Sequence, residues 1–435
     1  MTERTTLIAA ATESPAFLRA VSDMGARRPV ATSRAIYNHQ GIKLLEGGMT
    51  VDGGLYDRLL THRLSAPLDE NLATDAPVTG VLLREAAEAA MARLPFFALM
   101  GPRRRTRSTL LQSIEAIPLP APVAFHLTLA RETRPSVFEH GISMALLCAH
   151  LVRETGAPIH DMTVAASAGL LHDLGMLHID AALFEAGNRL SADELRPLYA
   201  HPVTSSMLIA RFHEYPSSVA RAVLEHHELL DGSGYPRGLP AEAISPLGRL
   251  LSLCEVVTAM FDGERDRPEQ RVSLLLRVSP HRFDAALVPS IHRLLRALPP
   301  IDEIVEATIA DSVERLRGLA DLLSRWHATV ATSVPTLDAR ANALLEAMAA
   351  QAQTLQRMLF EAGITPEQLT FLTEVVEPDM PLRAEMLALT RELQWHLRSS
   401  ANQFRRRWRS DAGGQPFPPA VAAWLDEVEA QDAPA

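Results

Sequence analysis

The chain has 435 residues, of which 47% are hydrophobic, and it carries a formal net charge of −10 at neutral pH. This length predicts two or three domains, and the apolar content excludes a wholly disordered protein. The negative charge argues against direct nucleic-acid binding, because proteins that bind nucleic acids usually present a basic surface.

The sequence shows no pattern that predicts a membrane span, because its apolar segments are too short or interrupted by charges. The first thirty residues lack the pattern of a secretory signal. Cys148 and Cys254 lie in apolar helical patterns, which indicates buried thiols rather than a disulfide. We therefore expect a cytoplasmic protein.

Residues 1–120 are predicted to form an N-terminal module with short β-strands. Residues 35–37 and 42–45 are expected to be strands on either side of a turn that contains Gly41. Residues 80–100 are predicted to be helical, and a proline-rich stretch at residues 118–122 is expected to link this module to the next domain.

The central domain contains an unusual concentration of histidines. Ten of the sixteen lie between His126 and His227. His140 shares a helical face with apolar residues and should point inward, and His172-Asp173 ends an apolar helix. Any one of these side chains alone would be interpreted as a structural core residue, but imidazoles and carboxylates grouped together suit divalent metals.

Further polar residues follow in similar apolar surroundings. His201 precedes Pro202, at a predicted helix start, and His226 and His227 end another apolar helix. Glu255 lies within the apolar run 250–257, where a carboxylate must be paired, protonated or bound to a metal. The glycines of residues 231–236 allow backbone amides to face a phosphate, with a plain Asp-Gly turn as the alternative.

Residues 301–435 are predicted to form a helical C-terminal domain. An apolar stripe with helical spacing consists of Leu337, Ala341, Leu344, Met348, Ala352, Leu355 and Leu359. We interpret the stripe as intramolecular core, with the seam of a homodimer as the alternative. A C-cap is expected at Gly363, and the next helix is expected to start at Thr365-Pro366.

Over residues 121–300 these motifs resemble the HD-GYP subgroup of the HD-domain phosphohydrolases. That family shows a helical His, then His-Asp-x-Gly-Lys, His-Pro, His-His-Glu-x-x-Asp-Gly-x-Gly-Tyr-Pro and a helical acid. The matching residues here are His140, His172-Asp173-Leu174-Gly175, His201-Pro202, residues 226–236 and Glu255. The resemblance implies a mainly α fold, in which an HD-domain helical core carries a small β-containing N-terminal module and a helical C-terminal extension.

The resemblance also implies two divalent metal ions, iron or manganese first, with zinc, nickel or cobalt as alternatives. The implied ligands of one ion are His140, His172, Asp173 and Glu255, and those of the other are Asp173, His201, His226 and His227. His172 and Asp173 would be the catalytic pair, and a metal-bridging hydroxide would be the nucleophile. The implied substrate-binding residues are Gly234, Tyr235, Pro236, Arg237 and Arg249.

The function implied is a bacterial signalling phosphodiesterase for a cyclic dinucleotide, most readily cyclic di-GMP, with signalling proteins as further partners. Three residues depart from the family pattern. Met176 replaces the motif lysine, Glu255 replaces the usual aspartate, and Ser136 stands where members with a third metal carry glutamate. Loss of the lysine charge leaves an alternative, a degenerate HD-GYP sensor or adaptor that binds metal or nucleotide and signals through its flanking domains.

Overall fold

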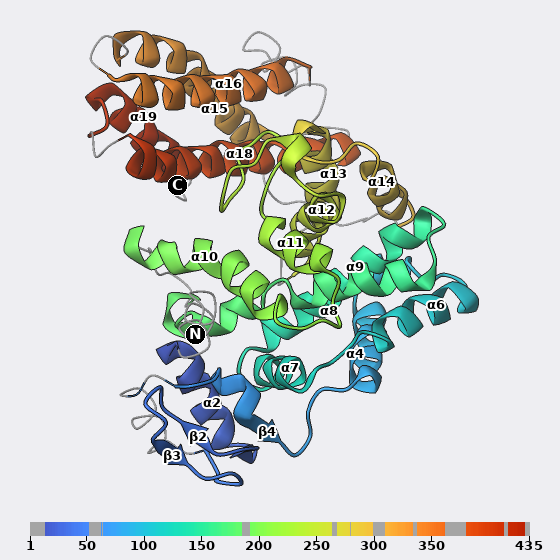
Figure 1. Ribbon diagram of the computed structural model, residues 1–435. Helices are drawn as coiled ribbons and strands as arrows, with labels where there is room; N and C mark the ends of the chain where they lie inside the picture. Colours follow the sequence, from blue (N-terminus) through green and yellow to red (C-terminus); the bar gives the residue numbers. More distant parts are fainter. Residues whose placement is uncertain are drawn as a thin grey trace. The chain divides into compact units, whose positions relative to one another are not determined.

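The computed structural model describes residues 14–51, 62, 64–184, 192–262, 268–278, 280–298, 309–333, 337–361, 380–412 and 416–430. The chain divides into two compact units (Figure 1). The N-terminal unit comprises Met1–Arg265 and His281–Pro299, and the C-terminal unit comprises Asp266–Pro280 and Pro300–Ala435. The described residues are mainly helical, as predicted. Domain boundaries near residues 120 and 300 stay predictions.

The N-terminal unit begins with a small β-containing region, in which Figure 1 shows α2 beside the strands. Its elements are α2 (Pro15–Gly25), β1 (Val30–Thr32), β2 (Ile36–Tyr37), β3 (Lys43–Leu45), the short 3₁₀ helix η1 (Leu68–Asn71) and β4 (Leu72–Thr74). Strand β1 pairs antiparallel with β4, and β2 pairs antiparallel with β3. The β2–β3 pair confirms the predicted strands on either side of Gly41.

The rest of the N-terminal unit, as far as the structure describes it, is mainly helical. Its α-helices are α4 (Gly80–Arg93), α5 (Pro95–Ala98), α6 (Arg104–Glu115), α7 (Ala121–Thr133), α8 (Pro135–Glu154), α9 (Ile159–Leu171), α10 (Ala192–Ile209), α11 (Ser217–Glu225), α12 (Pro246–Phe261) and α14 (Val288–Arg296). Its 3₁₀ helices are η2 (Leu174–His178), η3 (Ala181–Phe184) and η4 (Ala241–Ala243), and η5 (Pro280–Arg282) stands where the chain re-enters this unit. The helix predicted over residues 80–100 is interrupted at Leu94, so that α4 and α5 are separate.

Helices α8 and α9 pack closely against each other in the core. A Cβ atom at Gly169 of α9 would lie 2.9 Å from the carbonyl oxygen of Met144 on α8. Only glycine therefore permits this close backbone approach. The approach brings the end of α9, where His172 stands, to the side of α8 that carries His140.

Helix α8 is, among the described residues, the one helix that is long and apolar enough to cross a membrane. About two-thirds of its most apolar window (67%) is buried inside the fold. Helices α7, α9 and α12 pack against it. Such burial is typical of a core helix, and length and composition alone do not make α8 a membrane span.

Two buried contacts join the β-containing region to the helices. The ring of Phe17 stacks on both His126 and His178, with centroid distances of 5.0 and 4.7 Å. Asp69, whose side chain is fully buried, accepts two hydrogen bonds from the Arg211 guanidinium, one of them 3.0 Å long from Nη1 to Oδ1. The region is therefore packed into the helical unit rather than held beside it.

The C-terminal unit is mainly helical in its described part. Its helices are α13 (Pro268–Val278), α15 (Ile309–Ser333), α16 (Ala339–Glu361), α18 (Met380–Asp411) and α19 (Pro419–Ala430). The predicted stripe is core, because its members from Ala341 to Leu355 are buried together with Trp326 and Trp408. The side chain of Leu359 and the helix boundary expected at residues 363–366 lie outside the described residues. A homodimer through these helices stays a prediction.

Candidate metal centre

Three helices and the ends of two others supply the predicted ligand residues. His140 lies in α8 and Glu255 in α12, while His172 and His226 are the C-cap residues of α9 and α11. The predicted helix ends at His172 and His226 are thus confirmed. The helix start predicted at His201 is wrong, because His201 lies inside α10 and Pro202 is accommodated within that helix.

Three of the histidines bind backbone in the same way. In each case Nδ1 lies close to the carbonyl oxygen three residues earlier: Gly169 for His172 at 2.7 Å, Leu198 for His201 at 2.5 Å, and Val223 for His226 at 2.6 Å. A carbonyl oxygen only accepts, so Nδ1 carries the proton and donates it. In the neutral imidazole the lone pair is therefore on Nε2.

The local sequence explains why these carbonyls are available. The last carbonyls of a helix have no amide partner within it, which applies to Gly169 in α9 and Val223 in α11. Leu198 lies inside α10, but the residue four positions later is Pro202, which has no N–H. The His-Pro dipeptide thus frees a carbonyl for the imidazole of His201.

The Nε2 atoms of His201 and His226 converge on one oxygen of Asp173. They lie 3.1 and 3.7 Å from its Oδ1, and 3.2 Å from each other. Two imidazole lone pairs at this distance repel each other unless a proton or a cation lies between them. His227 completes this group, since its ligand atom lies within 4.8 Å of those of His201 and His226.

The other oxygen of Asp173 faces a second group. Its Oδ2 lies 3.5 Å from Nε2 of His172, which in turn lies 3.3 Å from Oε2 of Glu255. The same Glu255 oxygen is 2.8 Å from Nε2 of His140. The ligand atoms of His140, His172 and Glu255 all lie within 4.8 Å of one another. Asp173 therefore stands between two groups of three side chains, which brings all seven predicted ligands together.

These side chains fit divalent metal ions. The fully buried Nε2 of His172 makes no hydrogen bond within the described part of the chain, although two carboxylates lie close to it. A buried polar atom without a partner is costly, and a lone pair directed at a metal removes that cost. Nitrogen and carboxylate donors together suit iron, manganese and zinc.

The imidazoles of the cluster fall into two groups, those whose pKa is lowered and those whose pKa is raised. Burial raises the pKa of Asp173, but the neighbouring His172 and His201 outweigh it, and this pKa lies well below its usual range. Burial lowers the pKa of His227 to about 3 and that of His226 well below its usual value. His140 and His201 are also buried, but adjacent carboxylates raise the pKa of both.

Asp262 is a member of the site that sequence reasoning missed. Its carboxylate accepts a hydrogen bond from Nδ1 of His140, whose Nε2 faces Glu255. Asp262 is the C-cap residue of α12 and lies 122 positions from His140 in the chain. No local spacing could have linked them. A carboxylate on the outer nitrogen fixes the orientation of a ligating imidazole and raises its basicity.

The loop of residues 231–236 is held by backbone contacts. The buried carboxylate of Glu228 accepts from the amides of Arg237 and Leu239, at 2.8 and 2.9 Å, and the amide of Tyr235 donates to the carbonyl of His227 at 3.0 Å. A Cβ atom at Gly234 would lie 2.4 Å from that same carbonyl oxygen. Within residues 231–236, the amides of Gly232 and Ser233 also donate to the protein, to the Leu229 carbonyl and the Asp231 carboxylate. The expectation that the loop amides face a phosphate is therefore wrong for Gly232, Ser233 and Tyr235.

Of the predicted substrate-binding side chains, Tyr235 lies beside the cluster, whereas the two arginines bind other parts of the protein. Tyr235, followed by the half-buried Pro236, stacks its ring on His227 with centroids 4.5 Å apart, so it adjoins the cluster. The guanidinium of Arg237 binds Glu225 at 3.3 Å. The Arg249 guanidinium donates to the carbonyls of Ala241 and Ile244 and lies 3.7 Å from Asp284. These contacts of both arginines are to residues outside the cluster: Arg237 binds the end of α11, and Arg249 binds the segment before α12.

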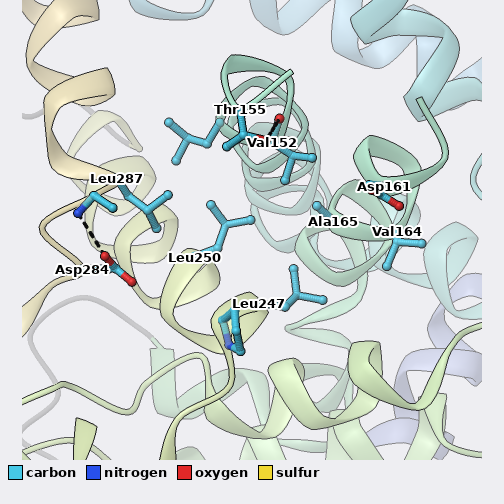
Figure 2. Close-up of a pocket in the computed structure, with 12 residues that line it drawn as sticks. Val152, Thr155, Asp161, Val164, Ala165, Leu247, Leu250, Asp284 and Leu287 are labelled. Carbon is cyan, nitrogen blue, oxygen red and sulfur yellow. Dashed lines mark hydrogen bonds between the residues drawn. The ribbon is translucent and has the colours of Figure 1, made fainter. Parts of the chain in front are cut away.

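Asp284 belongs to a separate cavity of about 350 Å³ (Figure 2). Its walls come from α8, α9, α12 and residues 284–287, and Figure 2 shows Leu250 and Leu287 among them. None of the seven clustered residues lines this cavity. The contact with Asp284 therefore associates Arg249 with the cavity rather than with the histidines.

Comparisons with known proteins agree with these motifs. Residues 125–287 match the model of the HD domain family. The chain is 29% identical over 153 residues to the 3'3'-cGAMP-specific phosphodiesterase 1 of Vibrio cholerae, covering 35% of each chain. It is 30% identical over 193 residues to the cyclic di-GMP phosphodiesterase PA4108 of Pseudomonas aeruginosa, covering 44% of this chain and 46% of the relative. The matches thus span less than half the length of these relatives.

The comparison with solved structures also found a protein that aligns with this chain. It is Bd1817, an HDG"Y"P protein from Bdellovibrio bacteriovorus, with 17% sequence identity and a TM-score of 0.35. The alignment covers 62% of this chain and 94% of that protein.

Replacement of Asp262 should weaken metal binding without removing a ligand. We expect Asp262→Asn to lower Mn²⁺ affinity by about 10–100-fold, because the amide no longer supplies a charge to His140. Competition with a fluorescent chelator measures the affinity. Asp284→Asn, a carboxylate change outside the cluster, is the control and should leave the affinity unchanged. Equal affinities for all three proteins would refute the role of Asp262.

Metal affinity should fall as the pH is lowered from 8 to 6. The raised pKa values of His140 and His201 mean that protons stay on these imidazoles at higher pH than usual, and a metal must displace them. The apparent affinity should decrease by about tenfold per pH unit for each displaced proton. His226 and His227 remain neutral in this range and do not compete. A flat profile in the same competition titration would mean that these imidazoles do not bind the metal.

Proposed function

We propose that the protein, whose residues 125–287 match the HD domain family, is a metal-dependent phosphodiesterase that hydrolyses a cyclic dinucleotide. One observation carries the proposal. The two oxygens of Asp173 face two separate groups of buried nitrogen and oxygen ligands, at distances of 3.1 to 3.7 Å. A carboxylate in this position can bridge two cations.

The ligand groups suggest how two divalent ions would be held. One group is His140, His172 and Glu255, the other is His201, His226 and His227, and Asp173 is common to both. Iron or manganese is the first choice for such mixed donors, with zinc, nickel or cobalt as alternatives. When bound, paired ions of this kind supply a nucleophilic water at neutral pH and neutralise charge on a phosphoryl group.

The residues of the chain prepare the site for an anionic substrate. Asp173 and Glu255 are the two carboxylates of the cluster, and their low pKa values keep both ionised. Two divalent cations against two carboxylates leave a net positive charge, which attracts a phosphodiester. Backbone hydrogen bonds fix His172, His201 and His226, so their Nε2 atoms need no reorganisation before ligation.

The relatives support the choice of substrate. Their names specify cyclic di-GMP in one case and 3'3'-cGAMP in the other. Both molecules are cyclic dinucleotides with two phosphodiester bonds, and we take cyclic di-GMP as the first candidate. The protein would then act in bacterial signalling. A sensor that binds metal or nucleotide without turnover is the alternative, and Met176 in place of the motif lysine is the observation that favours it.

Hydrolysis of cyclic di-GMP tests the proposal directly. The protein is purified without oxygen, loaded with iron or manganese, and the products are separated by chromatography. We expect product from the wild type and a loss of more than about 100-fold in Asp173→Asn, because a bridging ligand should matter more than an outer-shell residue. His213→Gln is the matched control, since the His213 side chain is 96% exposed.

Two results would contradict this. Intact substrate after incubation with protein that holds two metal ions would favour the sensor. Equal rates for the wild type and Asp173→Asn would place the hydrolysis outside this cluster.

Restoring the lysine should increase the rate. Met176 lies in η2, where Arg134 donates to its backbone carbonyl, and the contacts of Arg237 and Arg249 are to residues outside the cluster. We expect Met176→Lys to raise kcat/KM about tenfold, the effect of one hydrogen bond to a charged group. Met176→Gln, of similar length without charge, separates charge from shape. An unchanged rate for Met176→Lys would show that the site does not need this cation.

A further inference from the structure

The ring of Tyr235 packs against another side chain of the protein. It stacks on the imidazole of His227 at 4.5 Å, with an angle of 23° between the ring planes. Its backbone amide also donates to the carbonyl of His227. The ring face that lies on His227 is not available to a ligand. These contacts suit a residue that holds a ligating imidazole in place.

A second tyrosine lies beside it. Tyr199 is on α10, two residues before His201, and its ring centroid lies 4.9 Å from that of Tyr235 at an interplanar angle of 75°. Both tyrosines are half-buried, so each keeps part of its surface accessible. The rings of His227, Tyr235 and Tyr199 form a continuous aromatic corner, which adjoins the ligand group of His201 and His226.

The position of Tyr199 in α10 is constrained. His201 is fixed by its hydrogen bond to Leu198, and Tyr199 lies between these two residues. Prolines at positions 197 and 202 flank the same helical turn, and the ring of each fixes its own φ angle. An aromatic ring held on such a turn binds a planar group with little further loss of conformational freedom.

We propose that Tyr199 forms a subsite that stacks on a nucleobase of the substrate, and that Tyr235 is a positioning residue for His227. This inference rests on the proposed function. A cyclic dinucleotide bound by its phosphodiester at the ligand cluster must place its bases beside that cluster. Aromatic rings stack on any base because every base has a π face. The aromatic corner supplies such a ring at the edge of the cluster.

Kinetics of Tyr199 variants test the subsite. Tyr199→Ala should raise KM for cyclic di-GMP by about 10–100-fold, the contribution of one stacked base, with kcat within about threefold of the wild type. Tyr199→Phe should behave like the wild type, because it keeps the ring. Inorganic phosphate, which has no base, should inhibit all three proteins with the same inhibition constant. Tyr37→Ala, which removes an exposed tyrosine elsewhere, should change nothing.

The role of Tyr235 has a different readout. Tyr235→Ala should lower the number of bound metal ions from two toward one, measured by elemental analysis, because His227 loses its support. Tyr199→Ala should keep two. An unchanged KM in Tyr199→Ala would overturn the subsite, and so would a loss in Tyr199→Phe equal to that in Tyr199→Ala. Full metal content in Tyr235→Ala would overturn the positioning role.

The test also separates this inference from the proposed function. If the wild type hydrolyses nothing, equilibrium dialysis with cyclic di-GMP replaces the kinetics. Binding by the wild type that is weakened about 10–100-fold in Tyr199→Ala would support the subsite in a non-catalytic protein. Equal binding by the two proteins, or no binding by the wild type, would overturn the subsite.

Discussion

The hydrogen bond from an imidazole Nδ1 to a carbonyl three residues earlier is the interaction on which the cluster depends. It occurs at His172, His201 and His226. A helix that stops, or that contains a proline, leaves carbonyls without amide partners. The histidine that follows satisfies one of them and in doing so directs its second nitrogen away from its own helix. A carbonyl that lacks its backbone amide partner thereby determines both the tautomer and the orientation of the imidazole ring.

The carboxylates in and around the cluster have different partners. Asp173 and Glu255 face the converging nitrogens, while Asp262 holds the outer nitrogen of His140. The Glu228 carboxylate accepts from the backbone amides of Arg237 and Leu239, directly after the turn that carries Tyr235. The conspicuous acid of the His-His-Glu motif is therefore a support for the loop. The sequence does not distinguish acids that face the ligand cluster from acids that hold its neighbours in place. Only the contacts in the folded structure distinguish them.

Much of this arrangement could be predicted from the sequence. The helix ends at His172 and His226 follow from apolar runs that stop at those residues, and Glu255 is conspicuous because its neighbours are apolar. Asp262 and Tyr199 could not be predicted, since their partners are distant in the chain and are reached only through the packing of α8 against α12 and of α10 against the 231–236 loop. The error at His201 has a physical reason: a proline normally marks the first turn of a helix, but here the imidazole replaces the missing hydrogen bond and α10 continues.

The contact between Asp69 and Arg211 has a practical consequence for dissecting the protein. A chain shortened to begin at residue 121 would leave Arg211 with a mostly buried guanidinium and no Asp69 carboxylate to accept from it. Breaking a buried ion pair on one side typically costs about 3–5 kcal/mol, comparable with much of the stability of a small domain. The same cut would remove Phe17 from the stack between His126 and His178. The histidine-rich helices are thus better expressed with the β-containing region attached.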